Sequence, residues 1–265
     1  MQEMRNTTPY AIAVLPFVQK DGRCVAAAIA KATFTLNEGG SDPVVDEEQV
    51  PIGFADDRFE ADNPLSSIRY AGEAVPKKEG TDVAIVGHAY SPKGMARAVD
   101  VQLRLGPLNR HIRIFGDRIW RRSFGRWKIS DPKPFERMPL RYEFAFGGRD
   151  TRHSDPARHL RDHRNPIGTG FVANGGHRDL EGLKLPNLEQ PGALIKSLKD
   201  RPPVAGFGFI DPGWEPRVSY AGTYDDQWLQ TRNPLLPDDF DERFYNAAHP
   251  DLVAVPHLSG GELFQ

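Results

Sequence analysis

Glycine and proline interrupt this chain so often that long regular helices are not expected. The 265 residues include 25 glycines and 23 prolines, which are dispersed along the sequence instead of being gathered in one tail. Glycine weakens helices and strands through its conformational freedom, and proline removes a backbone donor. We therefore expect short strands, turns and a few short helices, without a collagen-like or low-complexity segment.

Alternation of apolar and polar residues predicts the clearest strands. Val99–Leu105 has valine or leucine at every second position, and Ile112 and Ile114 continue the pattern in the next segment. A period of two gives a strand one apolar and one polar face. Together with Val83–Tyr90, these segments predict a three-stranded antiparallel meander with one buried face. Ile119–Arg122 is expected to add a further short strand.

The N-terminal part predicts a β-hairpin. Tyr10–Phe17 and Cys24–Leu36 are rich in strand-forming residues, and the dipeptide Asp21-Gly22 between them is a strong hairpin signal. Cys24 is the single cysteine, so no intrachain disulfide is possible. Because it lies in an apolar run, we expect it to be a buried, inert thiol.

The second half is expected to contain loops, short strands and the few helices. Prolines recur every few residues between 131 and 216, which predicts loops laid over the sheet. Helical turns are expected at Gln190–Leu198, Asp225–Arg232 and Asp238–Asn246, where acidic residues at the start favour the helix dipole in the last case. Val253–Leu258 is expected to be a final strand.

These patterns predict a mainly β fold. We expect an antiparallel sheet or sandwich-like core with long Pro/Gly-rich loops and a few short helices. No internal repeat or linker marks a domain boundary, so residues 1–265 are expected to form a single domain. A sub-boundary near residue 131 would separate the strand meander from the Pro/Gly-rich half.

Charge and hydropathy exclude several classes of protein. Lys and Arg total 34 against 36 for Asp and Glu, so the formal net charge is -2. A general nucleic-acid or anionic-membrane binder normally carries a basic excess, and we expect neither activity. The N-terminus has no apolar signal region, and no apolar run approaches the roughly 20 residues of a membrane helix. We expect a cytoplasmic protein without membrane insertion.

Tests for catalytic and metal-binding motifs give weak signals. His159 and His163 have the i, i+4 spacing of zinc ligands, but Pro156 and Pro166 argue against a helix there. His88 lies in a predicted strand and is more simply a hydrogen-bonded structural residue. There is no G-x-S-x-G elbow or phosphate-binding glycine loop, and caps and turns explain most acidic pairs. We expect no catalytic residues, no metal, no cofactor and no enzyme activity.

One segment, residues 117–128, points to contact with another macromolecule. It interleaves five basic residues with three aromatic ones, and Trp and Arg dominate protein-interface hot spots. Such a pattern also occurs in single-stranded nucleic-acid binders, but the rest of the chain has no basic excess. A structural role stays open, with the tryptophans in the core and the arginines paired with carboxylates such as Asp117. The candidate partner-binding residues are Trp120, Arg121, Arg122, Phe124 and Trp127.

Several segments together resemble the family named domain of unknown function 2169. The resemblance runs from about Asn6 to Leu258. Because several long motifs occur in the same order, it is specific. The matching segments are Gly80–Tyr90, Phe115–Arg121, Met138–Gly148, Asn165–Phe171, Leu185–Glu189, Asp200–Gly208, Ala221–Trp228, Pro234–Asp241 and Arg243–Asn246.

The resemblance implies a role in type VI secretion and no reaction. Members of the family look like non-enzymatic adaptors or chaperones that bind a cognate effector and help to load it onto the VgrG spike, often through a PAAR-containing or PAAR-linked region. The expected partners are therefore the effector, and with it a PAAR domain and VgrG. Two other classes stay open: a hydrolase, such as a carbohydrate-active one on a β scaffold, and a structural component of the secretion machine.

Overall fold

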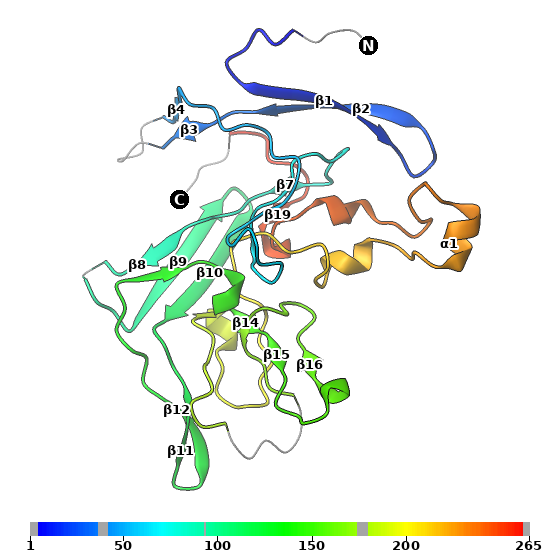
Figure 1. The fold of residues 1–265 in the computed structure, drawn as a ribbon. Coiled ribbons are helices and arrows are strands. Elements are labelled where there is room, and N and C mark those ends of the chain that lie inside the picture. The colour runs from blue at the N-terminus through cyan, green and yellow to red at the C-terminus, as the bar shows by residue number, and fades with distance from the viewer. Residues whose placement is uncertain (1–4, 37–41, 93, 174–179, 262–265) are drawn as a thin grey trace.

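The computed structural model describes residues 5–36, 42–92, 94–173 and 180–261. It shows a mainly β protein in which small, mostly antiparallel sheets are linked by long loops, and the helices are single short turns (Figure 1). The predicted fold class is confirmed.

The largest sheet has three strands and lies at the centre of the main core. β9 (Ala98–Leu105) and β10 (Leu108–Phe115) pair along their whole length, as the alternating pattern predicts. The third strand is β18 (Leu188–Glu189), which pairs with Arg113 and Ile114 of β10. Leu103, Ile112 and Ile114 point into the core and are at most 1% exposed.

The predicted meander is wrong in its first strand. Residues 83–87 are not a strand, because the Val83 N–H donates to the carbonyl of Leu252 and the Ile85 N–H donates to that of Phe207. Two distant parts of the chain therefore accept the backbone hydrogen bonds of this stretch, and β9 does not. The third strand of the sheet comes from residues about 75 positions further along the chain, as in the pair Ile114–Leu188, across the sub-boundary expected near residue 131.

The remaining strands form short two-stranded ladders. Most are antiparallel, and the β14–β17 pair is parallel. The pairs are β1 (Ala11–Val18) with β2 (Cys24–Lys31), β3 (Phe34–Thr35) with β4 (Val44–Val45), β5 (Asp57–Arg58) with β6 (Ile68–Tyr70), β7 (Thr81–Asp82) with β19 (Val253–Ala254), β8 (His88–Tyr90) with β13 (Arg137–Pro139), β11 (Trp120–Ser123) with β12 (Arg126–Ile129), β14 (Phe146–Gly147) with β17 (Thr169–Gly170), and β15 (Arg149–Asp150) with β16 (Leu160–Arg161).

The helices are single short elements, and several begin at a capping side chain or at a proline. The Asp225 carboxylate accepts from the Trp228 N–H and caps α1 (Asp226–Thr231), close to the expected position. The predicted segment Asp238–Asn246 is helical only in η5 (Glu242–Tyr245). The other 3₁₀ turns are η1 (Tyr142–Phe144), η2 (Pro156–Arg158), η3 (Pro191–Ala193), η4 (Arg217–Tyr220) and η6 (Pro250–Leu252). The final strand, expected over Val253–Leu258, is shorter and ends at Ala254. Among the described residues, no helix is long and apolar enough to cross a membrane.

A second, smaller hydrophobic cluster lies beside the main core, at the base of the β11–β12 hairpin. Its buried members are Trp120, Phe146, Leu185 and Ile195, and Trp127 and Ile129 pack against it. A buried ion pair stands next to this cluster. The Arg118 guanidinium, 6% exposed, contacts the Glu189 carboxylate, which is fully buried.

The polar partners of this ion pair join three parts of the chain. Arg118 also donates to the Pro186 carbonyl, 2.7 Å away, and its guanidinium lies over the Phe115 ring. Glu189 accepts from the backbone N–H of Ile195 at 2.7 Å. Because Glu189 belongs to β18, the pair fixes the chain that enters the β11–β12 hairpin onto the core sheet.

Removing one member of this pair is expected to be costly. Glu189→Ala leaves the Arg118 charge buried without its partner, and we expect a loss of about 3–5 kcal/mol in the free energy of unfolding. Denaturant titration measures it.

The double variant Arg118→Met/Glu189→Leu removes both charges and should recover most of this loss. As a control, Asp100→Asn breaks the exposed ion pair with Arg113 and should change stability by no more than about 1 kcal/mol. A Glu189→Ala variant as stable as the control would contradict this account of the pair.

Candidate partner-binding surfaces

All five predicted partner-binding residues lie on the β11–β12 hairpin, which projects from the body of the protein (Figure 1). The strand register places Trp120 opposite Ile129 and Arg122 opposite Trp127 on one face. Arg121 stands opposite Lys128 on the other face.

The structure separates these five residues by their exposure. Trp120 is 3% exposed and belongs to the core cluster, and Trp127 packs partly against it. Arg121 and Arg122 are exposed, and Phe124 at the tip is 100% exposed. The two tryptophans therefore hold the hairpin in place, and the arginines and Phe124 form its accessible surface.

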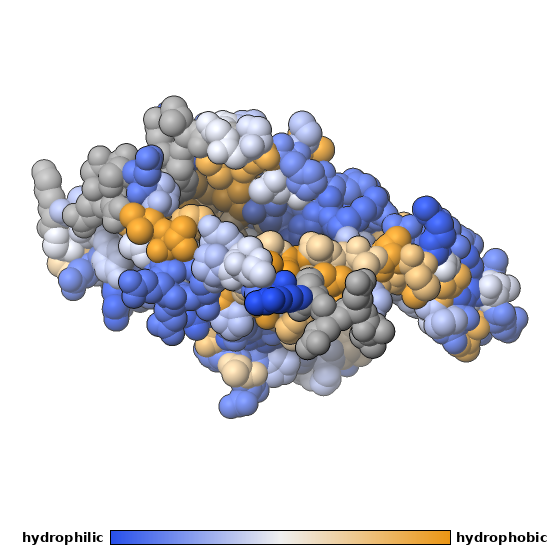
Figure 2. Space-filling model, turned by 90° about the horizontal axis from the view of Figure 1, so that it is seen from above, coloured by the Kyte–Doolittle hydropathy of each residue, from blue (hydrophilic) through white to orange (hydrophobic). Residues whose placement is uncertain are grey.

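A second surface is the outer face of the hairpin formed by β1 and β2, called here the N-terminal ribbon. Seven of its residues are exposed and none is charged: Val14, Pro16, Val18, Cys24, Ala26, Ala28 and Ala30. The opposite face is also apolar except for Lys31 and is half-buried. Viewed from the side on which the ribbon lies, the protein shows apolar patches among polar ones (Figure 2).

Sequence reasoning missed this exposed face. The expected buried thiol of Cys24 is wrong, because Cys24 is free and exposed on the outer face. A signal was present: in residues 24–30 both alternating sets are apolar, which is the pattern of a strand covered on both faces. In the structure, one of the two faces is not covered.

Both ends of the N-terminal ribbon are fixed to the body. Near its turn, Arg232 donates to the Lys20 carbonyl at 2.6 Å, and Lys20 donates to the Phe240 carbonyl at 3.3 Å. At the other end, Lys31 donates to the Pro51 carbonyl and forms an ion pair with Glu73, both at 2.9 Å. Within the described residues no third strand pairs with β1 or β2, so both ribbon edges are open.

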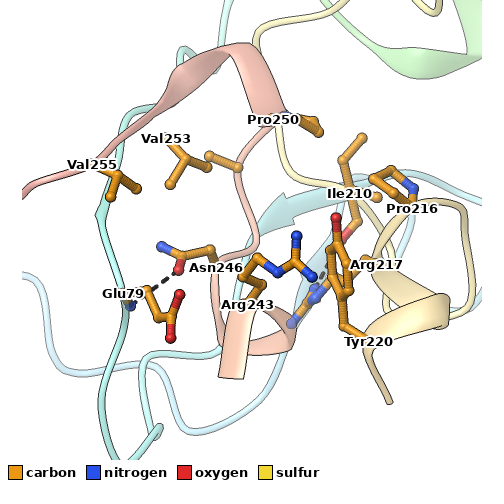
Figure 3. A pocket seen from close by; sticks show the side chains of 11 residues that line it. Glu79, Ile210, Pro216, Arg217, Tyr220, Arg243, Asn246, Pro250, Val253 and Val255 are labelled. Atoms are coloured by element: carbon orange, nitrogen blue, oxygen red, sulfur yellow. Dashed lines mark hydrogen bonds between the residues drawn. The ribbon is translucent and has the colours of Figure 1, made fainter. Parts of the chain in front are cut away.

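A cavity of about 300 Å³ lies between η4, η5 and the strand β19 (Figure 3). Ile210, Val253 and Val255 contribute to its apolar walls. Its polar lining includes one carboxylate, Glu79, and no histidine. A hydrolase of the kind considered above needs two carboxylates, or a histidine with a carboxylate, facing one space. The lining of this cavity does not supply either arrangement.

The two arginines of the cavity are engaged by the protein itself. Arg217 donates to the carbonyls of Phe244 and Ile210, and burial lowers the pKa of its guanidinium. Arg243 forms an ion pair with Asp241 and lies over the Tyr220 ring, 4.3 Å from its centroid. These contacts join η4 to η5, so we interpret both side chains as structural.

The described histidines do not converge on one site. His88 is exposed beside the Tyr90 ring, and His159 contacts the backbone carbonyl of His153. Within the described ranges, no group of three or more His, Cys, Asp or Glu residues could hold a metal ion.

His249 is the most perturbed histidine. Burial and the neighbouring Arg110 lower the pKa of its ring to about 4, although Asp251 acts in the opposite direction. Its Nδ1 accepts from the Asp251 N–H at 3.2 Å and caps η6, and Nε2 lies 3.1 Å from the Val204 carbonyl. The Arg110 guanidinium also lies 3.2 Å from Nε2. These contacts fit a neutral ring in a structural role.

These features define a mainly β protein with two hairpins that present exposed residues, the N-terminal ribbon and the β11–β12 hairpin. The chain belongs to the family described as an uncharacterized protein conserved in bacteria (DUF2169), whose model matches residues 21–265. The match begins in the turn of the N-terminal ribbon. No curated protein and no solved structure matches the chain significantly.

The separation of core and surface residues on the β11–β12 hairpin is directly testable. Trp120→Ala removes a large buried ring, and we expect a loss of about 3–5 kcal/mol in the free energy of unfolding. Arg121→Ala, on the neighbouring exposed position, should stay within about 0.5 kcal/mol of the parent protein. Thermal and denaturant unfolding measure both. Equal losses in the two variants would contradict the assignment.

His249 predicts acid sensitivity. Its pKa is lower in the folded protein, about 4, than the ordinary value of 6.5, so the unfolded chain binds the proton more tightly between these pH values. Stability should therefore fall as the pH drops from about 6.5 to about 4, by an amount on the order of 3 kcal/mol from this group.

His249→Asn keeps a side-chain acceptor for the Asp251 N–H and removes the titration. Unfolding free energies measured across this pH range should fall less steeply for the variant than for the parent. Parallel curves would rule out the buried neutral ring.

Proposed function

We propose that this protein is a type VI secretion adaptor that binds a cognate effector in the cytoplasm and helps to load it onto the VgrG spike. The contact is made with a PAAR-containing or PAAR-linked region of the effector. Membership in the family and the resemblance described above support this role, and the shape of the surface supports it independently.

The exposed apolar face of the N-terminal ribbon is the observation that carries the proposal. A sheet normally buries its apolar face against another layer, and an isolated two-stranded hairpin is marginally stable in water. An exposed apolar face marks a site of protein contact. The polypeptide of the effector covers this face and completes the missing layer.

The open edges of the N-terminal ribbon offer a second way to hold the effector. β2 has eight residues, with no proline and no charged residue before Lys31, so it lacks the usual features that protect an edge strand. An extended effector segment adds to this edge as a strand, where backbone hydrogen bonds supply affinity and the apolar faces supply selectivity. Binding the folded form of the effector stabilises that form by mass action.

The test is co-expression with the effector encoded beside this gene, followed by co-purification and measurement of affinity. The variant Val14→Lys/Ala28→Glu places opposite charges at directly paired positions of the ribbon, which preserves strand pairing while making the outer face polar. We expect the affinity to fall by about 10-fold to 100-fold, because buried charges must be desolvated.

A matched control is Asn109→Lys/Arg104→Glu, at an exposed pair on β9 and β10. It should bind like the parent protein. Failure of the parent protein to bind or stabilise the effector would refute the adaptor role, and equal binding by both variants would refute the ribbon as the contact.

A further inference from the structure

The tip of the β11–β12 hairpin has an unusual residue for its backbone geometry. Phe124 and Gly125 form a two-residue loop with φ values of 48° and 74°. Two positive φ angles are typical of a type I′ turn, where Asn, Asp or Gly is favoured at the first position. Phe124 is the one non-glycine residue with positive φ among the described residues.

No packing in the free protein compensates for this strain. The Phe124 side chain is 100% exposed, so the ring makes no stabilising contact with the rest of the chain. In the turns of the other two long hairpins, glycine occupies the positive-φ positions: Gly22 between β1 and β2, and Gly106 between β9 and β10. Residues held in such sparsely populated backbone conformations are concentrated at functional sites.

The flank of the same hairpin carries unpaired positive charge. Arg121, Arg126 and Lys128 lie on one face, according to the strand register, and all three are exposed. None of them has an ion pair within the described residues, so the face carries three free positive charges close together on one short hairpin. Glu181 contacts the backbone of the hairpin, where it accepts from the N–H of Arg122 at 2.6 Å.

The base of the hairpin is rigid. Trp120 is anchored in the core cluster, and the Ile119 N–H donates to the Ser130 hydroxyl at 3.0 Å where the two strands leave the body. A ring presented on a fixed support loses less conformational freedom on binding than one on a flexible loop.

We propose that the β11–β12 hairpin is a plug for an acidic partner polypeptide. The Phe124 ring enters an apolar pocket of the partner, and carboxylates at the rim of that pocket pair with Arg121, Arg126 and Lys128. This inference rests on the proposed adaptor function and adds to it the chemistry of the partner surface. We choose an acidic partner because of the charge of the hairpin face: a neutral or basic partner surface would leave its three cations without counter-charges.

The first test uses Phe124→Asn, with the effector encoded beside this gene as the probe. Asparagine suits the first position of a type I′ turn, so the melting temperature should rise by about 1–2 °C. Affinity for the effector should fall by at least about 10-fold, because the ring that fills the partner pocket is lost. If the variant is more stable but binds less tightly, Phe124 serves binding and is not needed for folding.

The second test reverses the charge of the face with Arg121→Glu/Arg126→Glu/Lys128→Glu. The association rate with the effector should fall by about 10-fold to 100-fold at low salt, and the difference should shrink as salt is added. The control is Arg104→Glu/Lys133→Glu/Arg137→Glu, which reverses three exposed basic residues elsewhere on the surface that also form no ion pair with a described residue. It should keep most of the parent association rate.

The outcomes distinguish this inference from the adaptor function. If the parent protein binds the effector and both hairpin variants bind equally well, the plug is refuted and the adaptor role stands. If the parent protein does not bind the effector, the adaptor function and the plug proposal are both refuted. Tighter binding of a single-stranded thymidine oligonucleotide than of the effector, abolished by the same charge reversal, would assign the face to nucleic acid and refute the acidic partner.

Discussion

The buried contact between Arg118 and Glu189 is the interaction on which the arrangement of this protein most depends. It connects the chain just before the β11–β12 hairpin to the short strand that completes the core sheet. Two charges removed from water are stable only when additional hydrogen bonds support them, and here the Pro186 carbonyl accepts from Arg118 and the Ile195 N–H donates to Glu189. One polar contact thereby fixes the direction in which a projecting hairpin leaves the body.

Because glycine and proline keep the strands short, side-chain contacts are needed to hold the parts of this fold in place. Most ladders contain two or three residue pairs, so backbone pairing alone does not define how the layers are placed. Buried polar residues supply the connections instead. Asn165, which is fully buried, donates to the carbonyls of Tyr142 and Phe146. The N-terminal ribbon and the β11–β12 hairpin are attached to this scaffold, and both present exposed residues that do not pack against it.

Local patterns predicted the local structure well. The alternation in Val99–Leu105 gave a strand, Asp21-Gly22 gave a hairpin turn, and Asp225 gave a helix cap. Pairing between distant segments could not be read in this way: β18 joins β10 because Glu189 and Leu188 are buried by tertiary contacts, and two residues carry no periodic signal. The sequence singled out residues 117–128 as a candidate binding segment, but it did not tell which of its side chains are buried and which are exposed. The exposure of Phe124 and the burial of Trp120 depend on how the hairpin meets the core.

The central claim is that exposed side chains of this protein hold another polypeptide. Hydrogen–deuterium exchange of the protein, alone and mixed with its effector, tests this claim most directly. The account predicts slower exchange on binding in residues 11–31 and 120–129, with little change in β9 and β10. Unchanged exchange in both ribbons, with protection confined to residues that line the cavity near Glu79, would contradict it.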